Sequence, residues 1–137
     1  MSFIDTAALQ DVKEPEAVDE GTYTLTIVNA EEKEAKSSGA PMIVVTMGID
    51  DHPDAAAVYL NLVLPREGDE AKTVQFKNLN LKRFLELAGA DYMDGFDTED
   101  LFGLNFEGFL SKEEVEQEDP DAPPKFRNEL HVPRLSA

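Results

Sequence analysis

The residues best suited to acid–base or metal chemistry are histidines and clustered acids, and their spacing fits neither use. His52 lies among Asp50, Asp51 and Asp54, a composition typical of an acidic hairpin turn. The acids at 91, 94, 97 and 100 recur at every third position, whereas a calcium loop needs ligands at alternate positions, a central glycine and a terminal glutamate. No serine, histidine and aspartate follow a hydrolase motif. We therefore predict no enzyme activity, no metal and no cofactor.

A second set of side chains has the chemistry needed to hold a polynucleotide. The bases of a single strand stack on aromatic rings, while lysine and arginine contact its phosphates. Tyr59 and Asn61 alternate with apolar residues, so they should face outward from a strand. Phe126 lies between two basic residues. The candidate binding residues are Lys33, Lys36, Tyr59, Asn61, Lys112, Lys125, Phe126 and Arg127. Ordinary packing of the aromatic residues and scattered surface charge are the alternative interpretations.

Five segments that alternate between apolar and polar residues are predicted to be strands. They are residues 21–32, 42–49, 57–64, 104–110 and 126–132. Between the third and fourth strands the period changes, because Leu81, Phe84, Leu85 and Ala88 follow helical spacing. This pattern predicts a helix from about Thr73 that ends at Gly89.

The order of three strands, a helix and two strands predicts a mainly β fold, a five-stranded OB-like Greek-key barrel with one helix between strands 3 and 4. The helix would plug one end of the barrel. In such barrels the second and third strands, with the loops joining strands 1–2 and 4–5, form the usual oligonucleotide-binding face. An open α+β sheet with the helix across one face is the alternative.

Length and composition indicate one globular domain with an acidic leader. The chain has 137 residues and no cysteine, and no apolar run is long enough to span a bilayer. We expect a leader over residues 1–20, a barrel domain over residues 21–137, a cytoplasmic location and no membrane partner. The first ten residues do not have the composition of a secretory signal.

The net charge of −17 argues against binding nucleic acid by bulk attraction. However, the acids are concentrated. Six lie in residues 5–20, five in 91–100 and six in 113–121, segments predicted to be a leader and loops. We therefore expect the binding face to be neutral or locally basic.

Several short motifs resemble the opening of phage-encoded OB-fold single-stranded DNA-binding proteins. They are Glu20-Gly21-Thr22-Tyr23, Ile27, Ala30, Lys33, Lys36-Ser37-Ser38-Gly39, Pro41-Met42-Ile43 and Ile49. The segments 81–89, 97–103 and 128–132 are similar in order and spacing, so the resemblance extends over residues 20–132. One departure is the C-terminus, which ends without the acidic tail that many such binders carry.

The resemblance implies non-specific binding of single-stranded DNA during phage DNA replication or recombination, in the cytoplasm of the host cell. It also implies replication or recombination proteins as partners, recruited here through the acidic segments, and it leaves homo-oligomer formation open. Two other functions fit the sequence. One is a virion or assembly component that uses the barrel as a scaffold, and the other is an acidic DNA mimic or adaptor that occupies a host protein's nucleic-acid site.

Overall fold

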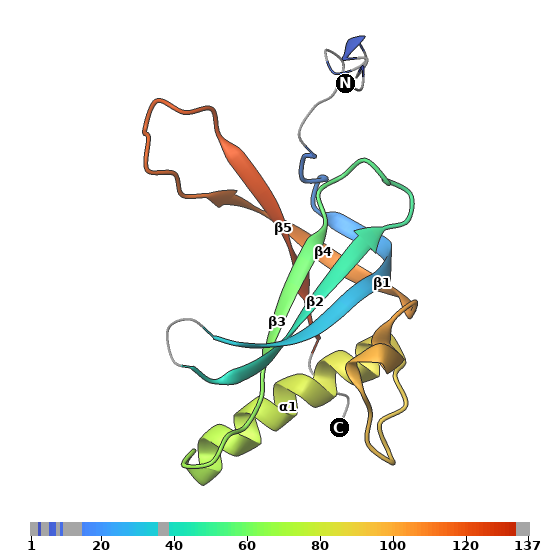
Figure 1. Cartoon of the computed structure of the whole chain (residues 1–137), viewed down its shortest axis with the longest axis vertical. Coiled ribbons are helices and arrows are strands. Elements are labelled where there is room, and N and C mark those ends of the chain that lie inside the picture. Colours follow the sequence, from blue (N-terminus) through green and yellow to red (C-terminus); the bar gives the residue numbers. More distant parts are fainter. Residues whose placement is uncertain (1–2, 4–5, 8, 10–14, 36–38, 134–137) are drawn as a thin grey trace.

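A five-stranded antiparallel sheet forms the body of the protein (Figure 1). The computed structural model describes residues 3, 6–7, 9, 15–35 and 39–133. The strands are β1 (Gly21–Glu34), β2 (Pro41–Ile49), β3 (Val58–Val63), β4 (Asn105–Val115) and β5 (Lys125–His131). Their order in the sheet is β3-β2-β1-β4-β5. The mainly β fold with five strands is therefore confirmed.

One α-helix, α1 (Ala71–Ala88), connects β3 to β4, as predicted. It ends at Gly89, whose φ of 75° is the left-handed conformation that favours glycine. A short 3-10 helix, η2 (Thr98–Leu101), precedes β4. No helix among the described residues is both long enough and apolar enough to cross a bilayer.

The core lies between the inner face of the sheet and α1. The alternating residues Leu25, Ile27, Val45 and Met47 are fully buried on β1 and β2. From α1, Phe84 packs edge-to-face on a phenylalanine of β4, with ring centroids 6.1 Å apart. The helical spacing of the sequence thus identified the face of α1 that contacts the sheet.

A β-bulge at Val28 changes which residues of β1 face outward. Ile27 pairs with Met47, but Asn29 pairs with Thr46, so Val28 has no partner in the β1–β2 register. Beyond the bulge the outward positions have odd numbers. β1 also continues to Glu34, so Lys33 lies within a strand and not in the predicted connecting loop.

The sheet is not closed into the predicted barrel. β3 and β5 are its two edges, and no ladder joins them in the described part of the chain. Residues 16–18 of the leader contact both sides of the sheet: the Ala56 amide, just before β3, donates to the Glu16 carbonyl, and Val18 is hydrogen-bonded to Asn128 on β5. This part of the leader therefore packs against the body.

Candidate nucleic-acid interface

The outer face of β3, β2 and β1 presents three rows of side chains, with one residue from each strand in every row. In each row the β2 residue is paired with the other two, and neighbouring strands lie about 4.8 Å apart. The rows are Tyr59–Thr46–Asn29, Asn61–Val44–Glu31 and Val63–Met42–Lys33. We call these nine residues the outer face. Seven of them carry no charge, so the outer face is a weakly charged surface on a strongly acidic protein.

Tyr59 is the large aromatic residue of the outer face, and 64% of its surface is exposed. Its cross-strand neighbour is Thr46, and Asn61 follows two residues along the same face. An exposed tyrosine ring on a rigid strand can stack on a base, and an adjacent amide can donate to or accept from base edges. The structure therefore brings Tyr59 and Asn61 together on an open surface.

Lys33 lies at the end of the outer face and is paired with Glu31. Its Nζ is 3.4 Å from Glu31 Oε2, and both side chains are more than half exposed. A hydrogen bond from Asn29 and the interaction with Lys33 hold the pKa of Glu31 below its usual value. Exposed ion pairs contribute little net energy. A phosphate can therefore compete with Glu31 for Lys33.

The hairpin of β4 and β5 separates the remaining candidates into two groups. The Lys112 ammonium lies 4.9 Å from the centre of the Phe126 ring and 3.4 Å from a carboxylate oxygen of Asp19. Arg127 projects from the opposite face of β5, because side chains alternate along a strand, and it pairs with Glu129 at 2.8 Å. Lys125 shares that opposite face. Lys36 lies outside the described residues.

The acidic turn near His52 is a structural feature. Asp50 accepts hydrogen bonds from Thr26 Oγ1 at 2.6 Å and from Asn105 Nδ2 at 2.7 Å. It therefore ties the end of β2 to β1 and β4. No group of metal-ligating side chains that could hold an ion occurs among the described residues.

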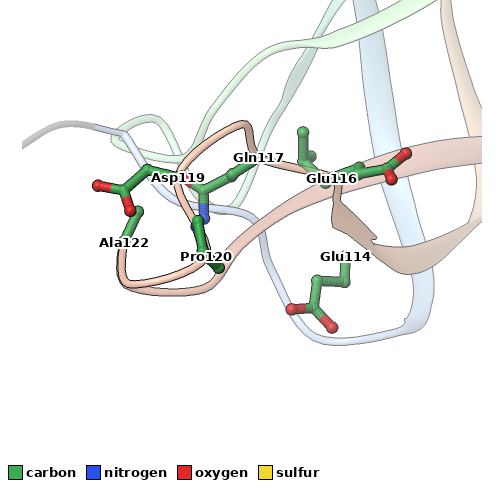
Figure 2. Close-up of a pocket in the computed structure, with 7 residues that line it drawn as sticks. Glu114, Glu116, Gln117, Asp119, Pro120 and Ala122 are labelled. Carbon is green, nitrogen blue, oxygen red and sulfur yellow. The ribbon is translucent and has the colours of Figure 1, made fainter.

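The loop joining β4 and β5 surrounds a hollow with acidic walls (Figure 2). The Gln117 side chain donates to the Pro123 carbonyl at 2.6 Å, which ties the two sides of the loop together. Figure 2 shows the carboxylates of Glu116 and Asp119 pointing to opposite sides. These carboxylates are arranged for contact with solvent or with a positively charged surface, not for ligation of one ion.

A groove that was not predicted from the sequence lies between β3 and α1. It has a volume of about 430 Å³, and its apolar lining residues are Leu60, Leu62, Val63, Phe76, Leu81 and Val132. Its ionisable lining residues are Lys77 and Arg83, both basic. One signal was present in the sequence: residues 71–85 contain four basic residues and no acid.

The sequence of residues 5–100 matches a family model described as "Protein of unknown function (DUF669)". The chain belongs to the DUF669 family. The matched region contains β1, β2, β3 and α1, and therefore the whole outer face and the parts of the groove contributed by β3 and α1. β4 and β5 lie beyond it. No curated protein gives a significant match to the sequence.

Proposed function

We propose that this DUF669 protein binds single-stranded DNA without sequence preference, in support of phage DNA replication or recombination. We also propose that its sheet is an opened variant of the OB barrel. The strand order β3-β2-β1-β4-β5 and the position of α1 between β3 and β4 support this assignment. On such a sheet, the second and third strands are the usual oligonucleotide-binding surface.

The observation that carries the proposal is the exposure of Tyr59 on β3, in the first row of the outer face. A tyrosine that served only to fill the core would be buried. Here the ring is held on a strand between uncharged neighbours, where one base can stack on it. Stacking of one base on an aromatic ring contributes about 1–3 kcal/mol to the binding free energy, and every base can stack in this way.

The distribution of charge is compatible with this function despite the net charge of −17. Glu31 is the only carboxylate among the nine residues of the outer face, and it is already paired with Lys33. With few cations available, stacking and apolar contacts would supply most of the affinity. Binding should therefore depend only weakly on salt, with a slope near −0.7 for each phosphate contacted.

The β4–β5 hairpin would extend the interface. Lys112 and Phe126 form a combined ring and cation surface on which a further nucleotide could rest. Lys125 and Arg127 lie on the outward side of the hairpin, as the outer face does, because their partners Val115 and Glu113 alternate with the buried Leu110. A bound strand would pass around the edge of the hairpin to contact both groups. In this arrangement Tyr59 and Asn61 form the centre of the site and the hairpin its periphery.

Fluorescence anisotropy of a labelled oligo-dT tests the proposal. We expect saturable binding at micromolar protein in low salt, about a tenfold loss in Tyr59→Ala, and near-normal affinity in Tyr59→Phe, which keeps the ring. Phe109→Ala is the matched control, because Phe109 is also an exposed aromatic residue on a strand but lies on β4. Equal losses in Tyr59→Ala and Phe109→Ala would disprove the assigned site.

A further inference from the structure

The helix α1 carries four basic residues, and three of them form no ion pair with any acid in the part of the chain that the structure describes. Lys77 pairs with Asp69 at 2.8 Å, but Lys72, Lys82 and Arg83 have no ion pair among the described residues. The Arg83 Nε atom is buried and has no hydrogen-bond partner among the described residues. In a protein with a net charge of −17, this helix is an exception.

The positive residues adjoin an apolar groove. Lys72, Phe76 and Arg83 are spaced i, i+4 and i+11, so they form one stripe along the helix. Phe76 and Arg83 line the groove between α1 and β3, and 62% of the Phe76 surface is exposed. The stripe therefore combines an aromatic contact with a basic residue on either side, a surface suited to an acidic partner that also carries apolar groups.

The loop of the β4–β5 hairpin has the complementary properties. Residues 113–121 contain six acids and no base, and no acid of this segment has an ion pair among the described residues. Val115 and Pro120 add apolar surface beside the carboxylates. Figure 1 shows the hairpin projecting at the upper left, whereas α1 lies along the bottom. The two surfaces are thus at opposite ends of one molecule.

We propose that the acidic β4–β5 loop of one copy docks on the α1–β3 groove of a second copy. Because the loop and the groove are different surfaces, the contact is heterologous, and it can repeat from copy to copy to form an open chain. Attraction between the loop carboxylates and Lys72 and Arg83 would orient the copies, while Phe76 would supply the central apolar contact. The contact needs no nucleic acid, so it can be tested separately from the function proposed above, although Asn61 and Val63 belong to both the groove and the outer face.

Sedimentation velocity of the full chain without nucleic acid tests this contact. We expect the average mass to rise with protein concentration at low salt and to fall to that of a monomer at about 0.5 M salt, because exposed charges are then screened. A monomer at every concentration in low salt would overturn the proposal.

A charge-swap pair of variants identifies the two surfaces. Lys72→Glu with Arg83→Glu makes the groove rim acidic, and Glu116→Lys with Glu118→Lys makes the loop basic. Each variant alone should self-associate at least about tenfold more weakly, because like charges then face each other. An equimolar mixture should regain association, because each loop then meets a groove of opposite sign. Failure of the mixture to associate, with both variants folded by circular dichroism, would overturn the proposal.

Two further variants serve as controls. Lys82→Glu changes an exposed charge that lies about 100° around the helix from Arg83, so association should persist. Phe76→Ala removes the aromatic contact without altering charge, so association should weaken. If Phe3→Ala with Leu9→Ala abolishes association while the loop variant retains it, the leader and not the loop occupies the groove, and the proposal is wrong.

Discussion

The side-chain amide of Asn128 holds the backbone of Val18 through a pair of hydrogen bonds. Asn128 Oδ1 accepts from the Val18 amide at 2.9 Å, and Asn128 Nδ2 donates to the Val18 carbonyl at 2.9 Å. Nδ2 also donates to the Ser111 carbonyl at 3.1 Å. Asn128 is only 8% exposed, so it fastens the leader to β5 where water has little access.

Replacing Asn128 should destabilise the protein more than replacing an exposed asparagine. In Asn128→Ala the backbone groups of Val18 and Ser111 lose their partners while partly buried, which costs about 1–3 kcal/mol. Urea unfolding measures the loss. Asn78→Ala, at an exposed position of α1, is the control and should change the free energy of unfolding by less than about 0.5 kcal/mol. Equal effects would show that the leader contributes little to stability.

The stability of the loop before α1 should depend on pH through Asp69. A hydrogen bond from Lys77, followed by one from the Arg66 backbone amide, holds the pKa of Asp69 below its usual value. A carboxylate with a lowered pKa in the folded state stabilises that state above the usual value, near pH 4. This contribution is lost as the pH falls through the folded-state pKa.

The Asp69→Asn variant should therefore lose stability relative to the natural protein at pH 7 and much less at pH 3. Urea midpoints at the two pH values give the comparison. Asp91→Asn is a suitable control, because this exposed carboxylate has no ion pair in the described chain. A difference of the same size at both pH values would show that the charge of Asp69 is not the source of its effect.

Much of the outer face could be predicted from the sequence because its residues lie in regularly alternating strands. The period of two in β3 identified Tyr59 and Asn61 as outward-facing, and the helical spacing identified Phe84 and Leu85 as inward-facing. These predictions depend only on local geometry. Alternation along β5 places Phe126 and Arg127 on opposite faces, although both were predicted to contact one bound polynucleotide.

The remaining features depend on contacts between distant segments. The bulge at Val28 shifts β1 by one residue and brings Lys33 onto the outer face. The contact of Val18 with Asn128 joins residues 110 positions apart. The openness of the sheet could not be predicted, because the spacing of residues within β3 and β5 does not determine whether two edge strands form a ladder.

The two charges of the outer face should affect DNA binding in opposite directions. Glu31→Gln removes the carboxylate paired with Lys33, so binding of oligo-dT should tighten. Lys33→Gln should weaken binding and make the slope of log affinity against log salt shallower by about 0.7. Anisotropy titrations over a salt series measure both effects. Unchanged affinity and slope in both variants would exclude Lys33 from the phosphate contacts.

Tyrosine fluorescence gives the most direct test of the central claim that a base stacks on Tyr59. The chain has no tryptophan and three tyrosines, and the hydroxyls of Tyr23 and Tyr92 are hydrogen-bonded within the protein. Unlabelled oligo-dT should quench the emission of the natural protein in a saturable manner. Tyr59→Phe, which still binds, should lose most of that quenching. Equal quenching in both proteins, or none in the natural protein at saturating oligo-dT, would contradict the account.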